Sequence, residues 1–107
     1  MMTKELRNGR GQLIGNIYRN TLFKRVKESK HLLRVHDAWA LDKVAFVKAE
    51  DAGVTCIVVH DTENNLIYSV SMDKFELNGI EVNYGHGTQI ALPKKYWDVS
   101  PNKDGVG

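Results

Sequence analysis

The chain has 107 residues, of which 42% are hydrophobic and 26% charged, and its formal net charge is +2. These values are typical of one ordinary globular domain with a modest core. The single cysteine, Cys56, excludes an internal disulfide framework and a Cys-rich zinc module, and no apolar run approaches the roughly 20 residues of a transmembrane helix. The N-terminal residues lack the apolar segment of a secretory signal, so we expect a cytoplasmic protein without a membrane anchor.

The first third of the chain predicts an arm followed by a segment with two alternative structures. Residues 1–11 are polar and glycine-containing, which predicts a flexible N-terminal arm. Apolar residues then recur every four positions, as on one helix face: Ile14, Tyr18, Leu22 and Val26. Poor helix formers separate them, so we favour strands over 12–18 and 21–27 with a turn between, although the helix stays an alternative.

The middle of the chain predicts an extended segment, a helix and a hairpin. Residues 29–41 look extended, and a helix over 43–52 follows, with Asp42 as its N-cap and Gly53 as its left-handed end. The apolar and β-branched run 54–59 predicts a central strand buried on both faces. Residues 61–65 form a turn, and the alternating residues 66–71 return as the second strand.

The last third predicts a short helix and a second hairpin. Ser71 can cap a helix over 72–77, which Asn78 and Gly79 end. Strands near 80–84 and 88–92 flank a turn at His86, and residues 100–107 predict a flexible tail. The sequence therefore predicts an α+β domain over 12–99. Its mainly antiparallel sheet combines two C-terminal hairpins with N-terminal strands, and the two helices pack on it.

Charge is distributed unevenly along the chain. Residues 1–34 contain nine basic and two acidic side chains, a balance of +7, whereas residues 35–107 contain six basic and eleven acidic ones, a balance of −5. Such asymmetry indicates either a polyanion-binding face or two surfaces that pair between subunits.

Aromatic rings alternate with cations in two segments, and this is the strongest functional signal. Cations bind phosphates and rings can stack bases. The candidate nucleic-acid-binding residues are Arg19, Lys24, Arg25, Lys27, Lys30, Arg34, Lys94, Lys95, Tyr96 and Trp97. No catalytic signature, metal site or cofactor motif is recognisable, and no RNA- or DNA-binding motif appears. We therefore expect a small non-enzymatic binding module that contacts nucleic acid weakly and without sequence preference.

Two alternative functions stay open. A self-associating interaction domain could pair the basic segment with the acidic remainder of a second copy, and exposed strand edges favour such a homodimer. A small metal-dependent hydrolase could use the dipeptides His36-Asp37 and His60-Asp61, although strand neighbours point to opposite faces. Whether His36, His60 and His86 meet in space is left open. Four residues are expected in the core rather than in a site: Cys56, Trp39, Phe46 and Phe75.

Overall fold

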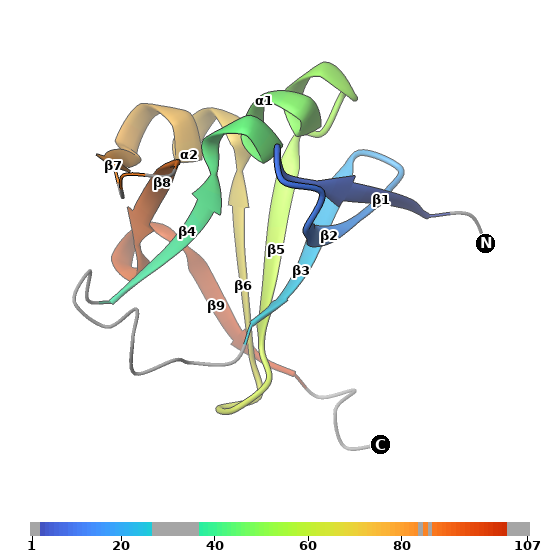
Figure 1. The fold of residues 1–107 in the computed structure, drawn as a ribbon. Helices are drawn as coiled ribbons and strands as arrows, with labels where there is room; N and C mark the ends of the chain where they lie inside the picture. The colour runs from blue at the N-terminus through green and yellow to red at the C-terminus, as the bar shows by residue number, and fades with distance from the viewer. Residues whose placement is uncertain (1–2, 27–36, 84, 86, 103–107) are drawn as a thin grey trace.

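The computed structural model describes residues 3–26, 37–83, 85 and 87–102. These residues form two β-sheets and two α-helices, so the predicted α+β class is confirmed (Figure 1). None of the helices in these ranges is long and apolar enough to cross a membrane.

The larger sheet has six strands in the order β1-β2-β3-β5-β6-β9. Its strands are β1 (Lys4–Arg7), β2 (Leu13–Tyr18), β3 (Thr21–Val26), β5 (Cys56–Asp61), β6 (Leu66–Ser71) and β9 (Asp98–Pro101). Neighbouring strands are antiparallel except β3 and β5, which pair in parallel. The strands predicted over 12–18 and 21–27 are confirmed as β2 and β3, and the helical alternative is wrong.

The smaller sheet has three antiparallel strands in the order β4-β8-β7. Its strands are β4 (Ala38–Asp42), β8 (Thr88–Pro93) and β7 (Ile80–Asn83). The helices α1 (Lys43–Asp51) and α2 (Met72–Asn78) lie together at one end of the two sheets, and a short 3₁₀ helix, η2 (Lys94–Tyr96), follows β8 (Figure 1).

Side-chain caps place the start of each helix where the sequence predicts it. Asp42 Oδ1 accepts a 3.0 Å hydrogen bond from the Ala45 amide, and Ser71 Oγ accepts one of 3.2 Å from the Lys74 amide. Gly53 follows α1 with a φ of +84°, a conformation that glycine adopts without a steric penalty.

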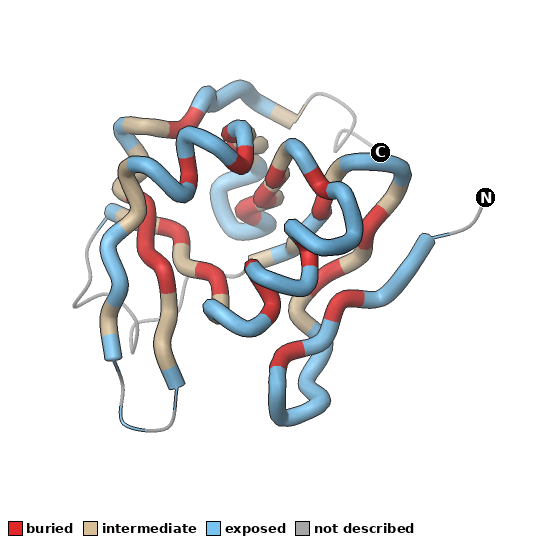
Figure 2. Tube along the Cα trace, turned by 90° about the horizontal axis from the view of Figure 1, so that it is seen from above, coloured by how far each residue is buried: buried red, intermediate tan, exposed pale blue. Residues whose placement is uncertain are grey.

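The core lies between the two sheets and beneath the helices, where the buried parts of the trace face one another (Figure 2). Phe46 of α1 and Phe75 of α2 stack with ring centroids 5.6 Å apart. Trp39 of β4 meets Tyr68 of β6 edge-to-face at 5.2 Å, which joins the smaller sheet to the larger one. Trp39, Phe46 and Phe75 are therefore core residues, as predicted.

Both ends of the chain contribute more to the fold than the sequence predicts. Within the predicted arm 1–11, β1 pairs with β2, and Leu6 enters the core with only 4% of its surface exposed. Within the predicted tail, residues 100–101 belong to β9, which pairs with β6. Polar composition misled both predictions, because one buried residue and a ladder of backbone hydrogen bonds suffice to hold an edge strand.

Strand β5 is central, as predicted, but it is buried on one face only. Ile57, Val59 and Asp61 are buried, whereas the alternating residues Cys56, Val58 and His60 are half-buried. Two-sided burial was the wrong prediction, and so was a core position for Cys56. A continuous apolar run indicates burial on both faces only where a second layer covers the second face.

Candidate nucleic-acid interface

The six-stranded sheet has an inner face toward the core and an outer face on the opposite side. Leu22 of β3 pairs with Ile57 of β5, and both are buried, so these positions define the inner face. Their sequence neighbours point the other way. On β3, β5 and β6 none of the outer-face residues is buried: Thr21, Phe23, Arg25, Cys56, Val58, His60, Ile67, Ser69 and Ser71.

Aromatic and cationic side chains gather at the β2–β3 end of this outer face. Phe23 is 43% exposed, and Arg25, two residues further along β3, is exposed on the same face. Tyr18 ends β2 opposite Thr21, which also places it on the outer face, diagonal to Phe23. The Arg19 guanidinium lies 5.3 Å from the centroid of the Tyr18 ring. We call Tyr18, Arg19, Phe23 and Arg25 the outer-face patch.

The turn that presents Arg19 is tightly constrained. Arg19 has a φ of +57°, a left-handed conformation that is uncommon for a residue with a side chain. The next residue, Asn20, accepts hydrogen bonds through its main-chain oxygen from the amides of Thr55 and Cys56, at 2.8 and 3.3 Å. The β2–β3 turn is therefore held to the start of β5, and Arg19 projects from a fixed piece of backbone.

A polar cluster borders the patch at the far end of β5. His60 stands beside Arg25 in the parallel register. Its Nε2 lies 3.1 Å from Asn102 Nδ2 and 3.4 Å from Asn65 Oδ1, while the Asn102 amide donates to Asn65 O at 3.0 Å. The sequence does not predict these contacts of His60 with Asn65 and Asn102, because the two residues lie 5 and 42 positions away along the chain.

Lys24, one of the predicted binding residues, points to the inner face instead. It shares that face with Leu22 and Val26, and its Nζ donates a 3.0 Å hydrogen bond to the main-chain oxygen of Ala40 on β4. Burial lowers the pKa of the Lys24 ammonium, and the Asp42 carboxylate partly offsets this effect. Lys24 is therefore a structural cation between the sheets and does not reach the outer-face patch.

Most of the second predicted segment, 94–97, serves the interior. Trp97 is 5% exposed, and its Nε1 donates to Leu92 O at 3.0 Å, so it is a core residue. The Lys94 Nζ lies over the Trp39 ring, 4.4 Å from the centroid. Lys95 is exposed and Tyr96 half-buried on η2, which follows the smaller sheet and so lies apart from the outer-face patch. The remaining candidates, Lys27, Lys30 and Arg34, lie outside the described residues.

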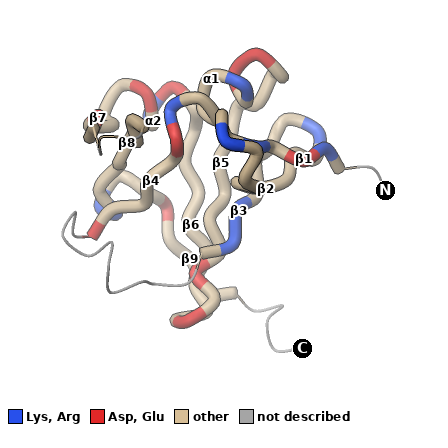
Figure 3. Tube along the Cα trace, in the orientation of Figure 1, with Lys and Arg blue, Asp and Glu red and all other residues tan. Residues whose placement is uncertain are grey.

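Several acidic residues lie on α1 and α2, where lysines accompany them, and basic residues lie along β1 and β3 (Figure 3). The pKa of Glu50 on α1 is raised by desolvation and by the nearby carboxylates of Glu76, Asp51 and Asp73. The two helices together hold four acidic and three basic residues, so the helical end is only slightly negative.

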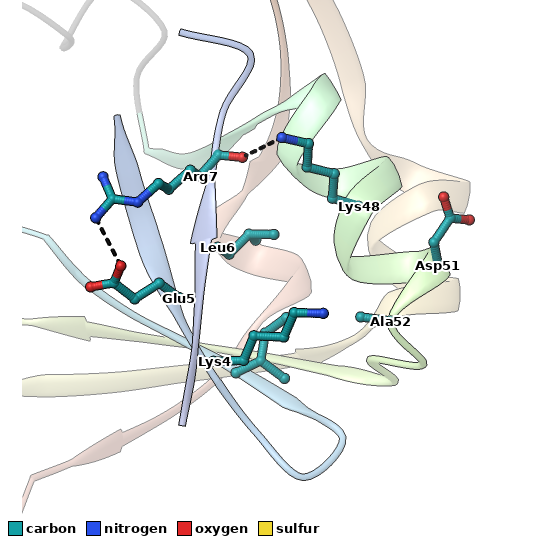
Figure 4. A pocket seen from close by; sticks show the side chains of 8 residues that line it. Lys4, Glu5, Leu6, Arg7, Lys48, Asp51 and Ala52 are labelled. Atoms are coloured by element: carbon teal, nitrogen blue, oxygen red, sulfur yellow. Dashed lines mark hydrogen bonds and ion pairs between the residues drawn. The ribbon is translucent and has the colours of Figure 1, made fainter. Parts of the chain in front are cut away.

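A cavity of about 380 Å³ lies between β1 and α1 (Figure 4). Three of its five charged groups have partners within the molecule. Arg7 pairs with Glu5 at 2.8 Å, and Lys48 Nζ lies 3.3 Å from the Arg7 main-chain oxygen. Lys4 and Asp51 also line it, so the cavity offers mixed charge and no concentration of cations for an anionic ligand.

The His-Asp dipeptides do not form a site within the described residues. His60 is half-buried on the outer face, whereas Asp61 is fully buried on the inner face, as strand geometry requires. His36 and His86 lie outside the described ranges, so their meeting with His60 is not addressed. Across the described residues, no group of three or more His, Cys, Asp or Glu side chains is arranged to hold a metal ion.

The comparisons with known proteins found no relative of this chain. No family model, no curated protein and no solved structure matches this chain.

Proposed function

We propose that this chain is a small non-enzymatic binding module that contacts nucleic acid through the outer-face patch. One observation carries the proposal: Phe23 and Arg25 alternate on the exposed face of a central strand, beside Tyr18 and its stacked Arg19. A ring and a cation on one open sheet face are what a nucleic acid needs, since the ring meets a base and the cation meets a phosphate.

The patch supports weak binding without sequence preference. Arg19 and Arg25 supply two cations, and the other described side chains on this face are mostly hydroxyl and apolar groups. Phosphate contacts position a nucleic acid without reading its sequence. We expect such a module to act in the cytoplasm, the location that the sequence predicts.

Retention on a single-stranded DNA column at about 50 mM salt tests the proposal, because phosphate contacts weaken steeply as salt rises. The double variant Arg19→Gln/Arg25→Gln is expected to elute earlier than the wild type. Lys43→Gln/Lys74→Gln is the matched control, since it also removes two positive charges, one from α1 and one from α2, at the helical end. If the wild-type protein is not retained, or if Lys43→Gln/Lys74→Gln elutes as early as Arg19→Gln/Arg25→Gln, the proposal is wrong.

The second candidate function, self-association, is favoured by β7. No other strand in the described part of the chain pairs with the second edge of β7. Ile80 on this strand is 58% exposed, and Leu77 just before it is 83% exposed. An unpaired apolar edge favours strand pairing with a second copy. Sedimentation at micromolar concentrations is expected to show a dimer that Ile80→Lys converts to a monomer; a wild-type monomer contradicts this function.

A further inference from the structure

We infer that the nucleic acid bound by the outer-face patch is single-stranded, with one base stacked on the Phe23 ring and a neighbouring phosphate at Arg25. The inference rests on the proposed function and specifies the form of its ligand. Phe23 is the starting point, because 43% exposure leaves much of a phenyl ring in water at the middle of a six-stranded sheet. A stacked base would remove that apolar surface from solvent.

The positions of Phe23 and Arg25 suit one nucleotide unit. They are two residues apart on one strand, so their Cα atoms are separated by about 6.6 Å along the strand. A base and the phosphate attached to its own sugar are separated by a comparable span. The cross-strand neighbours of Phe23 are Asn16 on β2 and Val58 on β5, both shorter than the ring, so a base can approach it from above the sheet.

The charges on the outer face indicate where the strand would run. Arg19 and Arg25 stand on either side of Phe23 along the chain, and the Arg19 guanidinium and Tyr18 ring offer a second flat surface. The acidic residues on this face lie toward its two edges, with Glu5 on β1 paired to Arg7 and Asp98 on β9. The favourable path therefore runs along β3, between the acidic edges of the sheet.

The same features disfavour a duplex. In a duplex each base face is covered by the neighbouring base pairs, so the Phe23 ring would find no base to stack on. The major groove of a duplex admits a helix or a two-stranded β-ribbon, whereas the patch lies on the face of a six-stranded sheet. Because a duplex carries the higher charge density, charge alone would make it the tighter ligand. A preference for single strands would therefore report stacking.

Fluorescence anisotropy with a labelled oligothymidylate of about 20 nucleotides and a duplex of the same length tests the inference. The wild type is expected to bind the single strand more tightly than the duplex. Phe23→Leu keeps an apolar side chain but removes the ring, and it should weaken single-strand binding about tenfold while leaving duplex binding unchanged. Phe23→Trp should bind the single strand at least as tightly as the wild type. Arg25→Gln should weaken both ligands.

Circular dichroism spectra checked for each variant separate loss of binding from loss of fold. If the duplex binds as tightly as the single strand, or if Phe23→Leu binds the single strand like the wild type, the stacking inference is wrong and the proposed function stands. If neither ligand binds and the single-stranded DNA column does not retain the protein, the proposed function fails and the inference fails with it. If Phe23→Leu unfolds, Phe23→Trp decides, because a folded Phe23→Trp with weaker single-strand binding also overturns the inference.

Discussion

The Nζ of Lys24 donates a 3.0 Å hydrogen bond to the main-chain oxygen of Ala40, and this bond joins β3 of the larger sheet to β4 of the smaller one. The amine satisfies a carbonyl that no described strand partner reaches. Since burial lowers the pKa of Lys24 below its ordinary value of 10.5, the folded protein holds the charged form at a cost in free energy.

This relationship predicts an unusual alkaline response for Lys24→Met. Between the lowered pKa and 10.5 the unfolded chain binds more protons at Lys24 than the folded one, so stability from this group rises as the pH rises through that window. The wild type should therefore gain stability relative to Lys24→Met between about pH 7 and pH 10. Urea midpoints of both proteins at the two pH values measure the change. A difference that is constant or shrinks with pH contradicts the prediction.

Asp61 gives the opposite dependence at acidic pH. Its side chain is fully buried and accepts hydrogen bonds from the Glu63 and Asn64 amides and from Asn64 Nδ2, at 3.0, 3.2 and 2.9 Å. Burial acts to raise the pKa of Asp61, but these bonds, together with the Lys94 charge, outweigh burial and hold the pKa below its ordinary value of 3.8.

We therefore expect Asp61→Asn to lose about 1–3 kcal/mol of stability at neutral pH, because the side-chain NH₂ group, itself a donor, would replace an oxygen that accepts hydrogen bonds from N–H donors. A depressed pKa contributes stability that is complete above 3.8 and is lost as the pH falls through the lowered value. The gap between wild type and variant should close over that acidic range in urea titrations. The exposed Asp98→Asn is the control, and it should show no comparable gap.

The two tryptophans should respond differently to the same substitution. Trp97→Phe removes the Nε1 hydrogen bond to Leu92 O, whereas the buried Trp39 Nε1 has no hydrogen-bond acceptor among the described residues. Trp97→Phe should therefore cost about 1–2 kcal/mol more stability than Trp39→Phe, measured as the difference in thermal midpoint. Neither variant should alter elution from single-stranded DNA, and a loss of retention by folded Trp97→Phe would show that Trp97 acts in binding after all.

Gly15 is predicted to tolerate no side chain. A Cβ at this buried position would lie 2.5 Å from the Phe23 main-chain oxygen, so β2 or β3 must move to admit it. We expect Gly15→Ala to lose about 1–3 kcal/mol of stability, as overpacked cores do. The matched variant Gly9→Ala places its Cβ no closer than 3.9 Å to Val44, and chemical denaturation should leave it close to the wild type. Equal losses in both variants would contradict the steric argument.

Locally encoded parts of this fold could be predicted from the sequence. The caps Asp42 and Ser71 bond to amides three residues onward, so the information lies within one turn of each helix. The hairpin of β5 and β6 likewise joins two neighbouring segments. Strand β9 depends on the distant strand β6 instead, and Leu6 reveals its role only once β1 is paired with β2.

The candidate site was only partly predictable for the same reason. Alternation along a strand assigns Phe23 and Arg25 to one face and Lys24 to the other, but it does not say which face is inside. The acceptor that decides this for Lys24 is Ala40, 16 residues away on another sheet. The prediction for Trp97 was wrong because the ring and N–H of a tryptophan suit a core position and a base-stacking surface equally well. Its position is decided by the hydrogen bond to Leu92 O, and a backbone acceptor of this kind is not visible in the sequence.

The parallel pairing of β3 with β5 also sets the order in which this chain can fold. In the larger sheet, β1 pairs with β2, β2 with β3, and β5 with β6, each across a short turn. The pairing of β3 with β5 instead requires residues 27–55, between Val26 and Cys56, to form a closed loop. Closing such a loop costs chain entropy before any contact compensates for it, and parallel pairing is intrinsically slow. The β1–β2–β3 unit, which carries the outer-face patch, should therefore dock onto the β5–β6 hairpin late in folding. A newly made chain would present Phe23 beside an unpaired strand edge until that step is complete.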